Sequence, residues 1–126
     1  MKYRASTKED VKWFLEKIQY KAAPDLKGIV AYDDDGISGM VAFDNWALNS
    51  VHAHVASNNA RCTMGLWKEV KRYLREHGYG VIIAQLPAHR DKAVRLIIKG
   101  FKFQELARIK DGWDKGSDII IAEYRL

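Results

Sequence analysis

The spacing of hydrophobic residues divides this chain into segments that alternate between strand and helix periodicity. The pattern is clearest in its central part, where an alternating segment, a helical segment, an apolar run and a second helical segment follow one another. In order these are 51–56 (VHAHVA), 61–78 (RCTMGLWKEVKRYLREHG), 80–86 (GVIIAQL) and 90–100 (RDKAVRLIIKG). The order is that of a βαβ unit. Its join, between Ala56 and Arg61, should place a strand end beside a helix N-terminus, where unpaired backbone N–H groups attract anions.

The beginning of the chain carries signals for a short strand and one amphipathic helix. Met1–Ala5 predicts the strand. Ser6 followed by Glu9 fits a capping box, so the helix should begin near Thr7, and Pro24 lies beyond its expected end. Its predicted apolar face, spaced at i, i+3, i+4 and i+7, consists of Val11, Phe14, Leu15 and Ile18.

A hairpin should follow this helix. Strands are predicted at Lys27–Tyr32 and Ile37–Asn45, joined by a tight turn at 33–36 (DDDG). Gly39 inside the second of these strands indicates either a bulge or the close approach of another group.

The next strand, Ser50–Ala56, alternates between apolar and polar residues. Successive side chains of a strand point to opposite faces, so one face should be apolar and the other should carry imidazoles. The apolar face consists of Val51, Ala53 and Val55, and the polar face of His52 and His54.

The C-terminal part predicts a buried strand, a helix and a closing hairpin. The apolar run Val81–Leu86 is typical of a strand covered on both faces, and Pro87 ends it. Two last strands are predicted at Phe101–Ile109 and Asp118–Arg125, joined by a polar turn (DGWDKGS). The complete order, β-α-β-β-β-α-β-α-β-β, predicts an α/β (α+β) fold with a mixed, mostly antiparallel sheet of about seven strands and three to four helices.

Composition indicates a single soluble globular domain over residues 1–126. The chain is 48% hydrophobic, which is enough to build a core at this length. No apolar run reaches the ~18–20 residues of a membrane span, and the N-terminal MKYRASTKED lacks the apolar segment of a signal peptide. Cys62 is the only cysteine, which excludes an internal disulfide and an all-cysteine zinc site. These features predict a cytoplasmic protein.

The net charge of +5 is compatible with nucleic acid, an acidic partner or a polyphosphate ligand. Nucleic-acid binders usually show a dense basic block or a recognisable motif, whereas the basic residues of this chain are spread out. The densest group, on one predicted helix, is Lys68, Lys71, Arg72 and Arg75. Nucleic-acid binding therefore has only the net charge in its favour.

Four segments, taken in order, carry a resemblance to a known protein family. They are Tyr3–Asp10, the pair Gly39–Trp46 and Val51–Ala56, Ala93–Phe101, and the pair Asp111-Gly112 and Asp118–Leu126. They are similar to an opening strand with a capped helix, two central antiparallel strands, a helix ending in Gly-Phe, and a closing hairpin. In this arrangement the chain resembles the GNAT superfamily of acyl-CoA-dependent N-acyltransferases, in particular its short phage and prophage members.

The resemblance implies a GNAT-like fold with acetyl-CoA as the cofactor. The thioester arm of that family lies beside the central strand, at positions that correspond to Val55 and Ala56. The pyrophosphate would bind backbone N–H groups at the following helix N-terminus, with a charge-assisted contact from the Arg61 side chain. The residues of that turn are Arg61, Cys62, Thr63, Met64 and Gly65. His89 or Arg90 stands where the family usually has an asparagine.

Transfer of an acyl group to an amine requires a group that accepts the amine proton. His54 is the first candidate, because the resembling family often places an acid or base on this strand and an imidazole exchanges protons near neutral pH. His52, two residues earlier on the same face, is the second candidate. Both are also consistent with an inert, hydrogen-bonded role in the sheet, or with a zinc pair, for which no third ligand is evident apart from Asp44 or Cys62. Tyr124 could protonate the leaving thiolate or simply pack.

Three further residues carry candidate chemistry. Asp44 and Trp46 precede the histidine strand and could line an amine pocket, since a carboxylate attracts a cation and an indole packs over it. Trp46 is also consistent with the core. Cys62 fits a nucleophile at a helix N-terminus, although direct transfer is the norm in the resembling family.

Together these observations predict an N-acetyltransferase that moves an acetyl group from acetyl-CoA directly to a primary amine with general-base assistance. The acceptor would be a small molecule, a peptide N-terminus or a lysine, and no metal is expected. The alternative is a GNAT-like binding protein without catalysis, of phage or prophage origin, acting on a host partner. Met64 and Leu66 favour this alternative, because they stand where the family has small residues. An exposed edge strand near the C-terminus would permit a homodimer.

Overall fold

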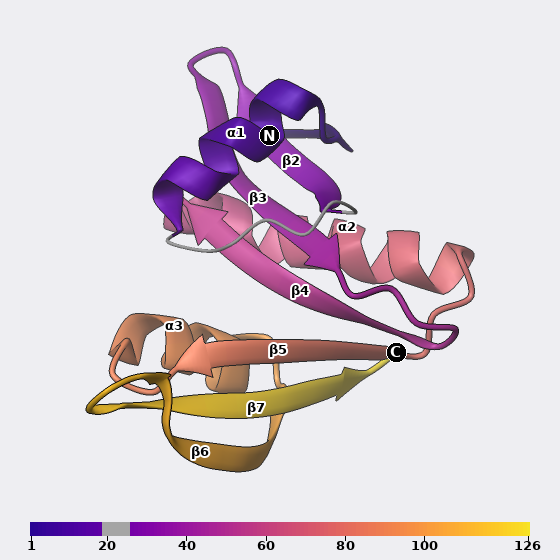
Figure 1. The fold of residues 1–126 in the computed structure, drawn as a ribbon. Coiled ribbons are helices and arrows are strands. Elements are labelled where there is room, and N and C mark those ends of the chain that lie inside the picture. The colour runs from indigo at the N-terminus through magenta and orange to yellow at the C-terminus, as the bar shows by residue number, and fades with distance from the viewer. Residues whose placement is uncertain (19–25) are drawn as a thin grey trace.

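The chain folds around one seven-stranded sheet with the strand order β1-β2-β3-β4-β5-β7-β6 (Figure 1). The structure, a computed structural model, describes residues 1–18 and 26–126. Every neighbouring pair of strands is antiparallel except β4 and β5, which are parallel. The strands are β1 (Lys2–Ala5), β2 (Lys27–Asp33), β3 (Gly36–Asp44), β4 (Ser50–Ser57), β5 (Val81–Pro87), β6 (Gln104–Asp114) and β7 (Ser117–Arg125).

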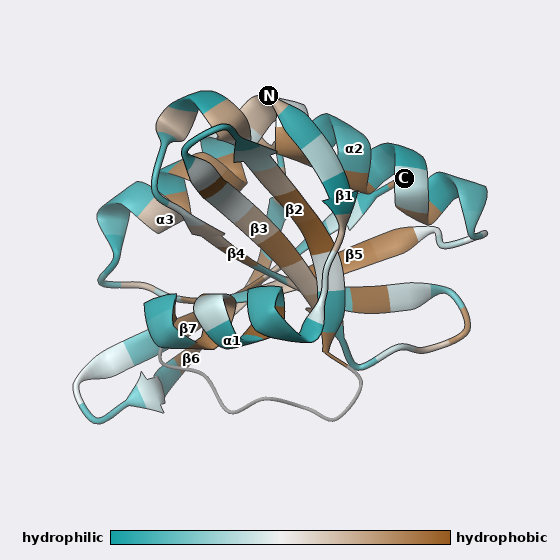
Figure 2. Cartoon of the chain, turned by 90° about the horizontal axis from the view of Figure 1, so that it is seen from above, coloured by the Kyte–Doolittle hydropathy of each residue, from teal (hydrophilic) through white to brown (hydrophobic). Residues whose placement is uncertain are grey.

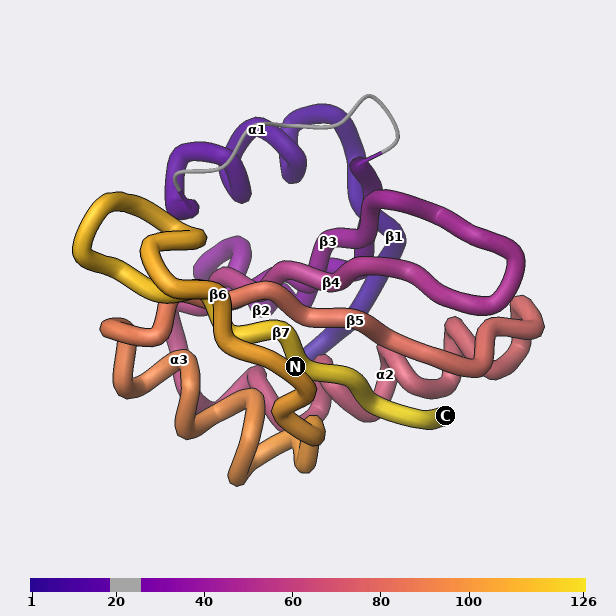
Figure 3. The backbone as a smooth tube through the Cα atoms, turned by 60° about the horizontal axis from the view of Figure 1, so that its bottom comes forward, coloured from indigo at the N-terminus to yellow at the C-terminus, as the bar shows by residue number. Residues whose placement is uncertain are grey.

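Helices cover both faces of this sheet. Helix α1 (Lys8–Lys17) lies on one face, and α2 (Thr63–Glu76) and α3 (Asp91–Arg95) lie on the other (Figures 2 and 3). A 3-10 helix, η1 (Ala60–Cys62), leads into α2, and a π-helical turn, η2 (Leu96–Gly100), continues α3. The predicted element order and the mixed sheet are confirmed. None of the helices in the described residues is long and apolar enough to cross a membrane.

Two layers of side chains hold the helices to the sheet. The larger layer lies between the sheet and α2 and α3, and it includes Leu66, Val70 and Leu74 of α2. The smaller layer lies between α1 and β2, β3 and β4, where Phe14 is fully buried. The sheet face that carries α1 is called the α1 face below, and the opposite face the α2 face.

The N-terminus of α1 is capped one residue later than predicted. Thr7 is the N-cap: its side chain accepts a hydrogen bond from the Asp10 amide at 3.3 Å, and the Asp10 carboxylate accepts one from the Thr7 amide at 2.8 Å. The box at Ser6 and Glu9 was therefore wrong. Ser6 instead accepts a hydrogen bond from the Gly28 amide at 2.8 Å, which ties β2 to the strand that precedes α1. The predicted stop at Pro24 lies outside the described residues.

The closing hairpin is longer than predicted. Strand β6 starts at Gln104, not at Phe101, because Phe101 packs into the core against the Trp67 ring, with centroids 4.8 Å apart. It then continues to Asp114, so the connection to β7 is only two residues long. The polar stretch 110–114 thus belongs to β6. The β6–β7 ladder is irregular there, between Ile109 and Asp114, and Asp111 has a φ of 55°.

Candidate functional site

Strands β4 and β5 separate after a short paired segment. Their parallel ladder contains three residue pairs and ends at His52 and Ile83. Beyond it β4 continues along β3 as far as the Gly39–Ser57 pair, and β5 continues along β7 as far as the Pro87–Ile119 pair. The sheet therefore opens between the C-terminal halves of two parallel strands, which diverge in Figure 1. Among the described residues, the edge of β4 from Ala53 onward has no partner strand on this side.

A cavity of about 90 Å³ occupies this opening, which we call the β4–β5 cleft. It is lined by residues of β4, β5, α3 and η2, by Ile18 directly after α1 and by Trp113 of β6. These residues are Ile18, Ala53, His54, Val55, Ala84, Gln85, Leu86, Pro87, Arg90, Ala93, Ile97 and Trp113. Because side chains of both sheet faces take part, the cleft connects the α1 face with the α2 face.

His54 lies at the α1 side of the cleft and is paired with a buried carboxylate. Its Nε2 lies 2.9 Å from Oδ1 of Asp44, which is fully buried on the neighbouring strand β3. A carboxylate can only accept, so Nε2 carries the proton of this bond. The Asp44 carboxylate therefore holds the imidazole in one orientation.

His52 shares this face but lies at the closed end of the opening. It pairs with Asp44 across the β3–β4 ladder and with Ile83 of β5. Burial lowers the pKa of His52 below its ordinary value of 6.5; the Asp44 carboxylate raises it and the His54 ring lowers it further. His52 does not line the cleft. The period-two prediction that both imidazoles share one face is confirmed, and the structure brings His54, not His52, to the opening.

The turn before α2 is the predicted phosphate site, and part of its hydrogen-bonding capacity is used internally. The Asn59 side chain accepts from the Arg61 amide at 2.9 Å, and the Cys62 amide donates to the Asn59 carbonyl at 3.1 Å. The Thr63 amide is bonded to the Ala60 carbonyl. The Arg61, Cys62 and Thr63 amides are therefore all engaged within the turn.

The side chains in this turn differ in what they offer a ligand. Arg61 is exposed, and Met64 is 55% exposed at the helix start. Leu66 is fully buried in the core, so it does not obstruct the turn. Gly65 lies against β1: a Cβ atom there would come within 2.0 Å of the Tyr3 hydroxyl. The glycine leaves room for the Tyr3 hydroxyl, a role that the sequence did not show.

Cys62 is fully buried and reaches away from the turn. It packs against β3, where a Cβ atom at Gly39 would lie 2.8 Å from its sulfur. The close approach predicted at Gly39 is confirmed. Only the backbone of Cys62 can contact a ligand at the helix N-terminus, and its thiol is placed as a packing group.

Two of the other predicted residues lie outside the cleft. Trp46 packs with Phe43 and Tyr79 at ring-centroid distances of 5.7 Å and 5.4 Å. Tyr124 packs edge-on against the Trp67 ring at 4.9 Å, on the α2 face, and pairs with Ile82 where β4 and β5 are still joined. The structure therefore does not bring either aromatic residue together with His54 in the cleft.

The two candidates near α3 are separated. Arg90 lines the cleft at the end of β5. His89 is exposed, and its Nδ1 is hydrogen-bonded to the Ser117 hydroxyl at the start of β7.

The residue that sequence reasoning missed is Trp113. It lies in the bulged part of β6, is 37% exposed and lines the cleft together with Ile18 from the end of α1. The polar composition of the surrounding segment, DGWDKGS, predicted a turn, so no signal in the sequence marked a site residue at this position. In the described part of the chain, no group of three or more His, Cys, Asp or Glu side chains is placed to hold a metal ion.

Comparison with known proteins gives matches in structure but not in sequence. No protein-family model and no curated protein sequence matches the chain. Among solved structures, it is similar to the ribosomal-protein-alanine N-acetyltransferase of Brucella melitensis, with 16% identity, 100% of both chains covered and a TM-score of 0.77. It is also similar to the spermidine/spermine N-acetyltransferase SpeG of Vibrio cholerae, with 10% identity, 98% and 91% coverage and a TM-score of 0.79.

A third similar structure is yncA of Salmonella typhimurium, a putative acetyltransferase solved with acetyl-CoA. Identity is 16%, 99% of this chain and 93% of that chain are covered, and the TM-score is 0.70. The chain therefore has the GNAT acyl-CoA N-acyltransferase fold over its whole length, as the resemblance predicted.

Proposed function

We propose that this protein is an N-acetyltransferase that moves an acetyl group from acetyl-CoA to a primary amine. The observation that carries the proposal is the β4–β5 cleft, called the acyl-transfer cleft from here on, with His54 and the buried Asp44 at its α1 side. The cleft joins two faces of the sheet, so a thioester can enter from one side and an amine from the other. Similar structures include one named as an alanine N-acetyltransferase and one solved with acetyl-CoA.

The residues present fit the acyl carrier. The unpaired edge of β4 at Val55 and Ala56 offers backbone groups to an extended arm, and the apolar wall at Ala93 and Ile97 excludes water from it. The exposed Arg61 and the first turn of α2 suit a phosphate group. Acetyl-CoA would supply an acyl group already activated as a thioester.

His54 is the proposed general base. Its Nδ1 accepts a proton from the attacking amine while Nε2–H stays bonded to Asp44, which holds the ring in one tautomer. A backbone N–H on the open edge of β4 is positioned to donate to the oxyanion that forms at the carbonyl carbon. The acceptor amine enters beside Trp113, whose ring suits the alkyl or cationic part of an amine.

A second candidate function is a GNAT-like binding protein of phage or prophage origin that acts on a host partner without catalysis. The observation that favours it is the turn before α2, in which Met64 is exposed and Gly65 is covered by Tyr3. In either case we propose a cytoplasmic location. A homodimer through β6, all of whose residues are exposed along the sheet edge, is compatible with both.

Release of free thiol from acetyl-CoA, measured with a panel of amines, tests the proposal. The panel contains a polyamine, a peptide with an N-terminal alanine and a peptide with one lysine, and mass spectrometry identifies the acetylated product. We expect turnover with at least one class. Binding of acetyl-CoA without any acetylated product across the panel would favour the second candidate. If the protein neither binds acetyl-CoA nor forms a product, the proposed cofactor and the proposed activity are both refuted.

A further inference from the structure

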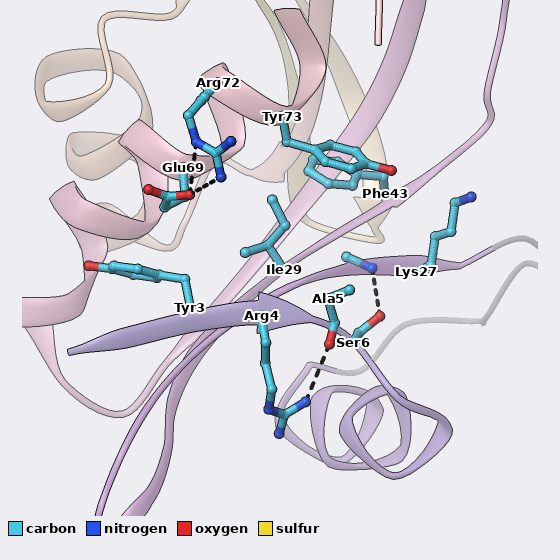
Figure 4. Close-up of a pocket in the computed structure, with 11 residues that line it drawn as sticks. Tyr3, Arg4, Ala5, Ser6, Lys27, Ile29, Phe43, Glu69, Arg72 and Tyr73 are labelled. Carbon is cyan, nitrogen blue, oxygen red and sulfur yellow. Dashed lines mark hydrogen bonds and ion pairs between the residues drawn. The ribbon is translucent and has the colours of Figure 1, made fainter. Parts of the chain in front are cut away.

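The basic residues of α2, the densest group in the sequence, are partly engaged in the folded protein. Arg72 is held by Glu69 at 2.6 Å, as Figure 4 shows, and by Glu76 at 3.0 Å. The Lys71 ammonium lies 5.4 Å from the centre of the Trp67 ring. Two of the four cations of α2 therefore already interact with neighbours on the same helix.

Segment 90–102, which contains α3 and η2, carries a larger excess of positive charge. It has five Lys or Arg residues and one acid, Asp91, so its net charge is +4 out of the +5 of the whole chain. All six charged side chains are exposed. Among the described residues, none of the six takes part in an ion pair or a cation–π contact. The charge of this segment is therefore available to a partner.

Three of these cations form one row along the helix. Lys92, Arg95 and Lys99 are spaced at i, i+3 and i+7, which places them on the same helical face. At 1.5 Å per residue the row is about 10 Å long. Together with Leu96 and Gly100 the three cations line an open hollow of about 470 Å³. We call this row and its hollow the α3–η2 face.

The α3–η2 face is separate from the acyl-transfer cleft. Ala93 and Ile97 of the same helical segment line the cleft, and neither lines the hollow. Helix α3 lies on the sheet face opposite α1, with β5 and β7 above it in Figure 3. A partner can therefore contact the exposed row of cations without entering the cleft.

The residues of this segment favour one kind of anionic partner. None of the large apolar side chains that are exposed in the described part of the chain lies within 90–102, and its one aromatic residue, Phe101, is 3% exposed. A protein partner anchors through aromatic and apolar side chains, a membrane through inserted apolar groups, and a nucleic-acid single strand through stacking on aromatic rings. A nucleic-acid duplex requires none of these, because phosphate contacts supply essentially all of its sequence-independent binding.

We propose that the α3–η2 face binds the phosphate backbone of a nucleic-acid duplex without preference for base sequence. A duplex carries one negative charge per ~1.7 Å of its length, so a row of about 10 Å faces about six phosphates. Lys92, Arg95 and Lys99 each contact one of them. The binding is non-covalent and does not depend on the proposed acetyltransferase activity.

Fluorescence anisotropy of a labelled DNA duplex of about 20 base pairs, titrated with the full chain in the absence of acetyl-CoA, tests the proposal. We expect a Kd on the order of 10 μM in 50 mM salt. Three phosphate contacts give a slope of log K against log salt of about −2.7, which is about a 40-fold loss of affinity between 50 and 200 mM. An RNA duplex of the same sequence should bind within about threefold, because the face contacts phosphates.

Two other polyanions are the comparison ligands. Polyglutamate carries about one charge per 3.3 Å when extended, half the charge density of a duplex, and should bind at least about fivefold more weakly. Phosphatidylserine vesicles should show no saturable binding, because the face has no exposed apolar group to insert. Either ligand binding as tightly as the duplex would overturn the proposal.

A triple variant removes the row of cations. Its substitutions are Lys92→Gln, Arg95→Gln and Lys99→Gln, all at exposed positions, so it should keep the urea midpoint of the unmodified protein. It should bind the duplex at least about tenfold more weakly, and the slope of log K against log salt should approach zero.

A matched triple variant removes the same net charge elsewhere. Lys2→Gln, Lys8→Gln and Lys12→Gln are exposed positions in and before α1, and together they should change the duplex Kd by less than about threefold. No binding of either duplex to the unmodified protein, an unchanged Kd in the α3–η2 variant, or equal losses in the two triple variants would overturn the proposal.

Discussion

Replacement of Asp44 by Asn should slow acyl transfer without unfolding the protein. The amide keeps the size of the side chain in its fully buried position but removes the charge that faces His54 at 2.9 Å. A hydrogen bond to an ionised group contributes about 1.5–3 kcal/mol, against about 0.5–1.5 kcal/mol for a neutral pair. The difference of about 1.4 kcal/mol corresponds to about a tenfold fall in kcat.

The same argument predicts how the pair behaves together. His54→Gln removes the proposed base and should lower kcat by at least about 100-fold. Because Asp44 acts through His54, adding Asp44→Asn to His54→Gln should cost little more, so the two effects will not add. His77→Gln, an exposed imidazole at the end of α2, is the matched control and should leave kcat unchanged.

Thiol release with an accepted amine gives kcat and KM for the four variants, and calorimetry gives the Kd of acetyl-CoA. We expect the variants at Asp44 and His54 to lose kcat while their Kd for acetyl-CoA stays within about twofold of that of the unmodified protein. If Asp44→Asn lowers kcat by the same factor whether or not His54 is present, Asp44 does not act through the imidazole and this account of the base is refuted.

Three further predictions concern stability and reactivity. Gly28→Ala should lower the free energy of unfolding by about 2–4 kcal/mol in urea titrations, because a Cβ atom there would lie 1.9 Å from the Val41 carbonyl oxygen; Gly116→Asn, in open space at a turn, should cost less than about 1 kcal/mol, and equal losses would contradict the packing argument. The hydrogen bond from Arg4 lowers the pKa of Asp10 below 3.8, so its stabilisation is present above that pH and lost as pH falls through the lowered value. Asp10→Asn should therefore cost about 2 kcal/mol at pH 7 and progressively less as the pH falls below 3.8; a loss independent of pH would refute the linkage. Cys62 should react with a thiol reagent only at the rate of unfolding, and rapid labelling of the native protein would show that its thiol is accessible.

Local periodicity was sufficient to predict the order of elements and the face of the histidines. Alternation along 51–56 places His52 and His54 together because the side-chain period of a strand is two. The partner of His54 was not predictable in the same way. Asp44 reaches His54 because the β3–β4 register pairs Asp44 with His52, and that register depends on the loop between the strands.

Long-range geometry accounts for the rest of the site. Trp113 enters the cleft because β6 continues through a bulge beyond the predicted turn, which no local pattern revealed. The β4–β5 ladder ends after His52 because the two strands twist apart, which is a property of the whole sheet. The role of Gly65 depends on Tyr3, which is distant in sequence and adjacent in space.

Titration of acetyl-CoA into the unmodified protein and into Ala93→Trp tests the central claim most directly. Ala93 lines the acyl-transfer cleft, and an indole there would fill its volume of about 90 Å³, while Lys12→Trp adds the same side chain on the exposed side of α1. The account predicts saturable binding that Ala93→Trp weakens at least about tenfold, or by about 1.4 kcal/mol, and that Lys12→Trp leaves unchanged. No heat of binding in the unmodified protein, or the same Kd in Ala93→Trp, would contradict it.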